Sequence, residues 1–132
     1  MTISSRCLAG FFLSLASAVA GAHHSFAVHY DGERIVSVSG VVEEFRFRNP
    51  HGMIRLTGAS ADGVEGTWTI ETNSPNILKR RGWSEDSIMP GDEVVIEGFP
   101  ANGGSLAMRV YRVSFADGRE LIGQQPAAGI ER

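Results

Sequence analysis

Histidines gather just behind the N-terminal apolar run of the chain. Three of the four, His23, His24 and His29, lie within the sequence AVAGAHHSFAVHY (residues 18–30). A cut by signal peptidase after Ala22 would leave His23 at the new N-terminus, where its amine and its imidazole can together chelate one metal ion. A second imidazole, from His24, His29 or His51, would complete a T-shaped site of three nitrogens. Such nitrogen-rich, tetragonal sites suit Cu(II).

Other cleavage positions also leave an amine close to a histidine. A cut before Gly21 gives the N-terminal sequence Gly21-Ala22-His23, in which the amine, two deprotonated amides and the imidazole can form a square plane around Cu(II) or Ni(II). A cut before Ala22 does the same with His24. We therefore expect a copper-class metal or no cofactor at all. In the second case His23 and His24 form a solvated lead-in, and His29 packs against the domain.

His51 is the fourth histidine and stands in the sequence RNPHG, between two predicted strands. We expect this turn at a rim of the domain, toward which the lead-in can return, so that His51 can meet His23 or His24. The predicted metal ligands are therefore His23, His24 and His51. The alternative is a purely structural turn, in which Asn49 caps, Pro50 fixes the backbone and His51 hydrogen-bonds to a main-chain group.

A second group of residues could contact a ligand or a partner. The sequence KRRGW (residues 79–83) places three cations beside an aromatic residue, which suits an anion or a lipid headgroup. Together with the start of the RNPHG turn, this predicts a ligand or partner surface of four residues: Arg48, Asn49, Arg81 and Trp83. The alternative assigns the cations to the end of a short helix, where the helix dipole favours them, with Trp83 packed beneath.

Composition and motifs argue against several function classes. The net charge is −3, from 12 basic and 15 acidic residues, and binding of nucleic acid needs a basic face. The sequence contains no nucleophile elbow, phosphate-binding loop, dinucleotide fingerprint or haem attachment motif. Adjacent carboxylates such as Glu43 and Glu44 would point to opposite faces of a strand, so they make a poor acid–base pair. We expect a binding protein that is not an enzyme and does not bind nucleic acid.

The N-terminus has the pattern of a signal peptide over residues 1–22. A short positive start is followed by the apolar run Cys7–Ala20 and by small residues. The run is shorter than the roughly 20 apolar residues that a transmembrane helix needs. We expect cleavage after Ala22, a periplasmic or secreted mature protein and no stable membrane insertion; an uncleaved anchor is the alternative. Cys7 is the single cysteine and leaves with the signal, so the mature chain cannot form a disulfide.

The mature chain alternates apolar and polar residues in short segments, which predicts an all-β domain. The apolar positions of the first segment change face near Gly40, which indicates a bulge or a sharp bend there. Pro75 at a helix start and Gly82 behind three cations predict one helix of about two turns. The expected strands cover residues 33–49, 53–59, 67–72, 93–99 and 106–115, and ADGREL (residues 116–121) could add a small hairpin.

Three strands, a short helix and two strands follow one another in the order of an OB-like, five-stranded Greek-key barrel. A small β-sandwich is the alternative, although a sandwich usually has about seven strands. We expect one domain over residues 23–122. A flexible tail is expected over residues 123–132, where the sequence has no pattern.

Several motifs together resemble a known protein family. They are AHHSF, GVVEEFRFRNPH (residues 40–51), SPNILKRRGW (residues 74–83), PGDEVVIEGFPANGGS (residues 90–105) and ADGREL. The combination is similar to the domain-of-unknown-function 6152 family of small exported bacterial proteins. The resemblance implies an exported, β-barrel-like domain without an established activity, and it places the histidine pair and the NPH turn in the recurring motif. The family often has an aliphatic or aromatic residue behind NPH, where this chain has Gly52 and Met53.

Two hypotheses for the function follow. The first is an exported binding module that holds a copper-class metal through His23, His24 and His51. The second is a metal-free structural or interaction domain that binds an envelope protein or a small ligand on the barrel face. Convergence of the three histidines would favour the first hypothesis, and their divergence would favour the second.

Overall fold

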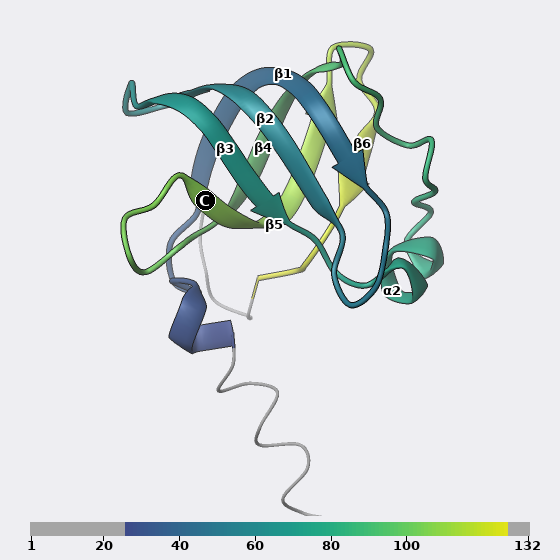
Figure 1. Ribbon diagram of the computed structural model, residues 1–132, viewed down its shortest axis with the longest axis horizontal. Helices are drawn as coiled ribbons and strands as arrows, with labels where there is room; N and C mark the ends of the chain where they lie inside the picture. Colours follow the sequence, from purple (N-terminus) through teal and green to yellow (C-terminus); the bar gives the residue numbers. More distant parts are fainter. Residues whose placement is uncertain (1–25, 127–132) are drawn as a thin grey trace, which may run out of the picture.

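Six strands and one short helix follow one another along the chain much as the sequence predicts (Figure 1). The computed structural model describes residues 26–126. A helical segment at residues 26–29 precedes the first strand. The elements are β1 (Val36–Arg46), β2 (Met53–Ser60), β3 (Glu65–Glu71), α2 (Pro75–Arg80), β4 (Glu93–Pro100), β5 (Ala107–Phe115) and β6 (Glu120–Ile122).

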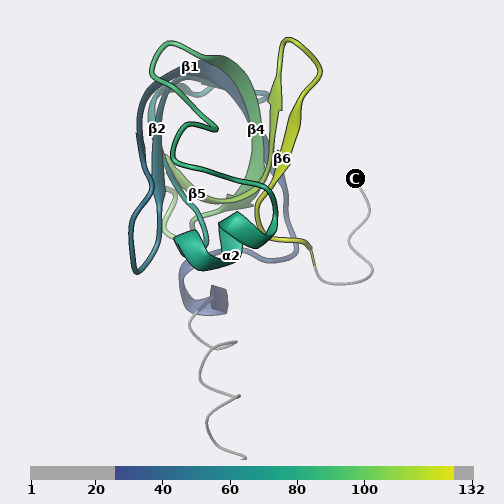
Figure 2. The ribbon, with the colours of Figure 1, turned by 90° about the vertical axis from the view of Figure 1, so that its right-hand side faces the viewer.

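The first five strands close into a barrel. Antiparallel pairing gives the order β3-β2-β1-β4-β5-β6, and an additional parallel pairing of β3 with β5 closes the ring, which is seen in Figure 2. This is the Greek-key order expected for an OB-like barrel. The prediction of an all-β barrel with one short helix is therefore confirmed, in preference to the sandwich. The predicted last hairpin is also present, because β6 pairs with the end of β5.

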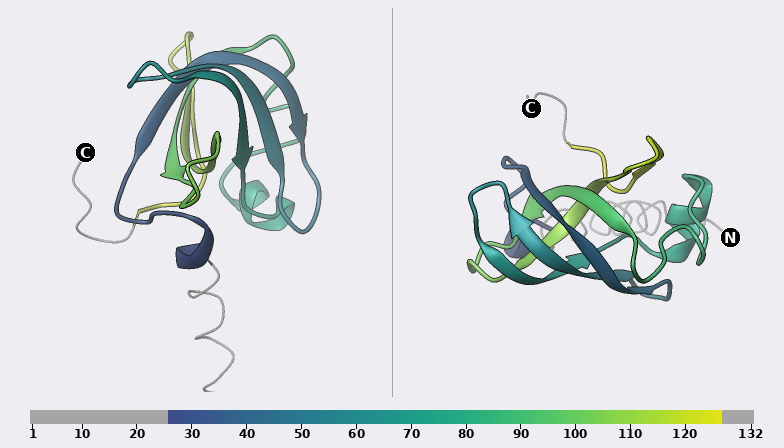
Figure 3. Two further views of the ribbon diagram at one scale, coloured as in Figure 1. Left: turned by 60° about the vertical axis from the view of Figure 1, so that its left-hand side comes forward. Right: turned by 90° about the horizontal axis from the view of Figure 1, so that it is seen from above.

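Strand β1 belongs to both halves of the barrel and curves over it (Figure 3). It pairs with β2 along one edge and with β4 along the other. Gly40 lies opposite Gly58 of β2, and a Cβ built on Gly40 would stand 2.3 Å from the carbonyl oxygen of Thr57. The irregularity that we placed near Gly40 lies between Val42 and Glu44 instead. Gly40 is thus a point of close backbone approach, and the bulge follows it.

The interior of the barrel is filled by aliphatic side chains from all five barrel strands. The fully buried set includes Val38, Val42, Ile54, Leu56, Ile70, Ile96, Met108, Val110 and Val113, joined by Leu78 of α2 and Ile88 behind it. Trp83 belongs to this core with 2% exposure, and its indole Nε1 donates to the carbonyl of Ile122 at 2.9 Å. Our prediction of Trp83 as part of a partner surface is therefore wrong: the residue closes the core behind α2.

Helix α2 is short because its start and end signals lie close together. Pro75 takes the first position, where a missing N–H costs nothing. Ser74 stands at the N-cap without a side-chain cap hydrogen bond. Lys79 and Arg80 occupy the last turn, and Gly82 ends the helix with a φ of +84°.

Part of the predicted C-terminal tail is attached to the barrel. The backbone N–H of Gly123 donates to Tyr111 at 2.7 Å, and that of Gln124 donates to Val110 at 3.0 Å. Residues 127–132 lie outside the described range. Within the described range, no helix is long and apolar enough to span a membrane.

Candidate functional site

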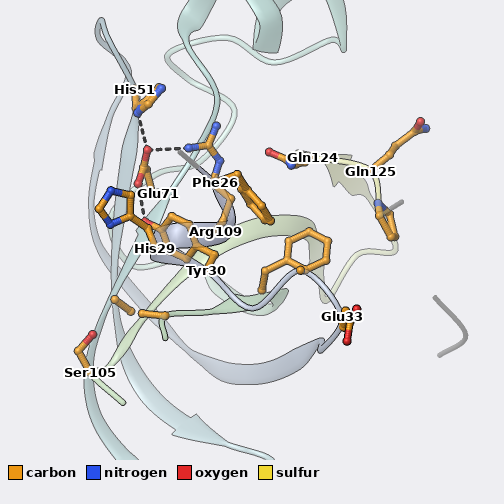
Figure 4. A pocket seen from close by; sticks show the side chains of 15 residues that line it. Phe26, His29, Tyr30, Glu33, His51, Glu71, Ser105, Arg109, Gln124 and Gln125 are labelled. Atoms are coloured by element: carbon orange, nitrogen blue, oxygen red, sulfur yellow. Dashed lines mark hydrogen bonds and ion pairs between the residues drawn. The ribbon is translucent and has the colours of Figure 1, made fainter. Parts of the chain in front are cut away.

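A pocket of about 1180 Å³ opens at one end of the barrel, between segments that are far apart in the sequence. Its walls come from the lead-in, from the β1–β2 loop (residues 47–52), from the end of β3, from β5 and its preceding loop, and from residues 124–126. Figure 4 shows His51 and Glu71 on one side and the amides of Gln124 and Gln125 on the other. The pocket therefore collects polar groups from five parts of the chain.

Glu71 is the common partner of three side chains in this pocket. Its carboxylate accepts hydrogen bonds from the hydroxyl of Tyr30 and, at 2.6 Å, from Nη1 of Arg109, and it pairs with Nδ1 of His51 (Figure 4). Strand β3 explains its direction, because Trp68 and Ile70 face the core and Glu71 faces the other way. The carboxylate is only 23% exposed, so its charge acts in a partly dry environment.

Arg109 lies beside Glu71 because the barrel closes there. The two residues are register partners in the short parallel pairing of β3 with β5. Arg109 is 9% exposed, and its Nη2 donates to Oδ1 of Asn73. Burial lowers the pKa of the guanidinium, while the charge of Glu71 works in the opposite direction. The Glu71–Arg109 ion pair thus connects the pairing of β3 with β5, where the barrel closes, to the wall of the pocket.

The backbone of the β1–β2 loop brings His51 to Glu71. Gly52 follows directly, and a Cβ on it would stand 2.5 Å from Oγ1 of Thr72. The backbone N–H of Thr72 donates to the carbonyl of Gly52 at 2.9 Å. A larger residue at position 52 would push the loop away from β3, so glycine here serves the approach of His51. The imidazole itself remains half exposed.

The lead-in is held against the barrel and forms another part of the pocket wall. The ring of Phe26 meets that of Phe99 edge-on with 5.6 Å between centroids. The side-chain amide of Asn102 donates to the carbonyls of Ala27 and Val28 at 2.9 and 3.0 Å. Tyr30 forms an isolated bridge with the loop behind β4, in addition to its bond with Glu71. Phe26, the first described residue, therefore lies at the pocket.

The predicted site residues have different positions. His51 lines the pocket, as does His29, which we proposed as a possible further ligand. His23 and His24 lie outside the described residues. Arg48, Asn49 and Arg81 are exposed, as a partner surface requires, but none of them lines this pocket.

Sequence reasoning missed three residues of the site: Tyr30, Glu71 and Arg109. The alternation of Thr67–Glu71 could have placed Glu71 on the face away from the core, but no local signal pairs it with Arg109. Among residues 26–126, no three histidine, cysteine or acidic residues come together as a metal site.

Tyr30 gives the site a testable pH dependence. Burial, followed by the hydrogen bond and the charge of Glu71, raises the pKa of its hydroxyl. Because the folded pKa exceeds the unfolded value of about 10, this stabilising contribution is complete below about pH 10 and is lost as the pH rises further. Between about pH 10 and pH 11, the free energy of unfolding of the wild type should fall by about 1 kcal/mol more than that of Tyr30→Phe, allowing for solvent screening. Urea unfolding at both pH values measures this; equal losses in both proteins would contradict it.

Comparison with known proteins assigns the chain to a family. No curated protein and no solved structure matches it significantly. A family model, described as a family of unknown function (DUF6152), matches residues 11–109. This match covers three quarters of the chain and includes β1 to β4, the NPH turn, Glu71 and Arg109. The chain therefore belongs to the family of unknown function DUF6152.

Proposed function

We propose that the chain is an exported binding module that holds a copper-class metal at the rim of the pocket. Signal cleavage after Ala22 supplies the amine and the imidazole of His23, and Nε2 of His51 supplies the third nitrogen. Three nitrogens in this arrangement suit Cu(II). With a cleavage before Ala22, the amine, two deprotonated amides and the imidazole of His24 form a square plane around the metal instead.

The pairing of His51 with Glu71 is the observation that carries this proposal. A neutral imidazole whose Nδ1 faces a carboxylate keeps its proton on that side, so Nε2 retains the lone pair that a metal needs. Nδ1 of His51 pairs with the Glu71 carboxylate, while half of the imidazole remains accessible. Carboxylates commonly fix metal-binding histidines in this way. The ring is thus prepared to bind through Nε2 before any metal arrives.

The position of the lead-in is the second support. Phe26 and His51 line the same pocket. An extended chain spans at most about 3.6 Å per residue, so the Cα of His23 lies no more than about 11 Å from that of Phe26. The new N-terminus is therefore within reach of the pocket that holds His51.

The proposal is tested on mature protein exported by its own signal. Its intact mass gives the N-terminal residue, and a Cu(II) titration followed by electron paramagnetic resonance gives the affinity and the number of nitrogen ligands. We expect one copper per chain and a loss of affinity of at least about tenfold in His51→Ala, since a ligand is worth more than the groups that orient it.

Arg48→Ala is the matched control, because it removes a neighbouring exposed side chain of the same loop that is not a proposed ligand. It should bind copper like the wild type. Equal copper affinity in His51→Ala and the wild type would show that His51 is not a ligand of the metal. Copper binding no tighter than that of a scrambled lead-in peptide would contradict the metal site as a whole.

A metal-free binding domain is the second candidate, and the size of the pocket favours it. The volume of about 1180 Å³ far exceeds the space of one metal ion, and the walls combine aromatic rings with the amides of Gln124 and Gln125. This composition suits a small organic ligand or a side chain of an envelope protein. Retention of such a ligand by metal-free protein and by His51→Ala alike would favour this function over copper binding.

A further inference from the structure

Unpaired cations gather at one end of the barrel, beside the pocket but outside it. The described part of the chain contains ten arginine and lysine residues. Five of them pair with carboxylates: Arg46, Arg55, Arg109, Arg112 and Arg119. The other five have no carboxylate partner among residues 26–126, and four of these lie on α2, just behind it, or on the β1–β2 loop. We call these four the basic end: Arg48, Lys79, Arg80 and Arg81.

The two elements of the basic end are neighbours in space (Figures 1 and 2). The ammonium group of Lys79 lies 5.9 Å from the ring centre of Phe47 in the β1–β2 loop. Nε of Arg80 donates to the carbonyl of Asn76 at 3.2 Å, within the helix. All four cations are exposed. The end of the barrel thus presents a group of positive charges directly to solvent.

No cation of the basic end forms an ion pair with a carboxylate of residues 26–126, although the charge of Arg48 contributes to a lowered pKa of Glu44. Arg81 lies close enough to Arg109 for its charge to lower the pKa of that guanidinium, after the larger effect of burial. Glu85 and Asp86 follow α2 in the sequence, yet neither forms an ion pair with a cation of the basic end in the described range. The chain as a whole carries a net charge of −3. A positive end on an acidic protein attracts an anionic partner.

The helix dipole explains only part of this arrangement. Cations in a last turn are favourable, which accounts for Lys79 and Arg80. A helix of six residues offers few aligned peptide groups, however. Arg48 lies on a different element, and the dipole gives no reason for its presence there.

We propose that the basic end adsorbs to the surface of an anionic phospholipid membrane. Clusters of at least four basic residues attract anionic headgroups. None of the four cations lines the pocket around Glu71, so they suit an extended charged surface better than one small anion. Ile77 of α2 is 39% exposed and adds an apolar contact at the interface. The binding is reversible and separate from the proposed metal site.

Sedimentation with lipid vesicles tests the proposal on the mature protein. We expect the wild type to bind vesicles of phosphatidylglycerol and phosphatidylcholine at low salt, and not vesicles of phosphatidylcholine alone. Each basic residue near an anionic surface contributes about a fivefold change in partitioning. The triple variant Lys79→Gln, Arg80→Gln, Arg81→Gln should therefore lose about a hundredfold. His51→Ala should bind vesicles like the wild type, which separates this test from that of copper.

The matched control removes the same number of charges elsewhere on the surface, through Arg34→Gln, Arg55→Gln and Arg119→Gln. Retained binding in this control supports the basic end, and circular dichroism confirms that both variants fold. An equal loss in the control would overturn the proposal in favour of a general charge effect. Absence of wild-type binding at low salt would overturn it directly. Binding to polyglutamate but not to vesicles would point to an acidic protein, and competition by millimolar inorganic phosphate to a small anion.

Discussion

Glu71→Ala should lower the free energy of unfolding by about 3 kcal/mol. The carboxylate is the only charged partner of Arg109 in the described part of the chain, and Arg109 is 9% exposed. Removing one member of a buried ion pair leaves the other charge uncompensated, which commonly costs about 3–5 kcal/mol. The lower value is expected because Glu71 retains some exposure. Urea unfolding at neutral pH measures the change.

A double variant shows whether the uncompensated charge causes this loss. Arg109→Met removes the charge and keeps much of the side-chain volume, so Glu71→Ala with Arg109→Met should regain most of the stability. The double variant should then lose much less stability than the sum of the losses in the two single variants. If the double variant is as unstable as Glu71→Ala alone, the carboxylate stabilises the fold through Tyr30 or His51 and not through the ion pair.

The conservative variant Glu71→Gln separates stability from the proposed metal site. Tyr30 and Arg109 donate to different oxygens of the carboxylate. In Glu71→Gln the amide oxygen can still accept from Arg109, and the amide NH2 can donate to the hydroxyl of Tyr30, so we expect the fold to survive. The amide no longer provides a charge to hold the proton of His51 on Nδ1. Loss of such a supporting carboxylate commonly weakens metal binding by about 10- to 100-fold. Unchanged copper affinity in a folded Glu71→Gln protein would show that Glu71 does not orient a ligand.

The strands and the helix could be predicted because their signals are local. Alternation of apolar residues and turn residues such as Gly63 and Pro90 depends only on neighbours in the sequence. The bulge in β1 was assigned to the wrong residue for a related reason. A glycine has no side chain to show which face it occupies, so the pattern alone could not distinguish a bulge at Gly40 from a close approach at Gly40 followed by a bulge.

The site could be predicted only in part, because its contacts depend on closure of the barrel. His51 was found from its place in a turn. Glu71 and Arg109 are separated by 38 positions and meet only through the parallel pairing of β3 with β5. That pairing involves three residue pairs and has no periodic signal of its own. Local sequence patterns could therefore not identify Glu71 and Arg109 as residues of the site.

Gly58→Ala should destabilise the barrel by about 3 kcal/mol, at the upper end of the usual cost of overpacking. A Cβ on Gly58 would stand 2.0 Å from the carbonyl oxygen of Ser39 and 2.7 Å from the Cα of Gly40. Both obstacles are backbone atoms, so no side chain can turn aside to relieve the contact. β1 and β2 must separate locally, and β1 also pairs with β4. The measurement is thermal and urea unfolding.

Gly103→Ala is the control for this substitution. A Cβ on Gly103 meets no atom within 4 Å, and its φ is not positive, so its stability should stay within about 0.5 kcal/mol of the wild type. If Gly58→Ala also unfolds like the wild type, β1 and β2 can move apart without cost, and their close approach is not needed for closure of the barrel. A large loss of stability would show that the close approach of Gly40 and Gly58 allows β1 to pair in both halves of the barrel. Closure there is also what places Glu71 beside Arg109, so the geometry of the pocket depends on two glycines that never touch it.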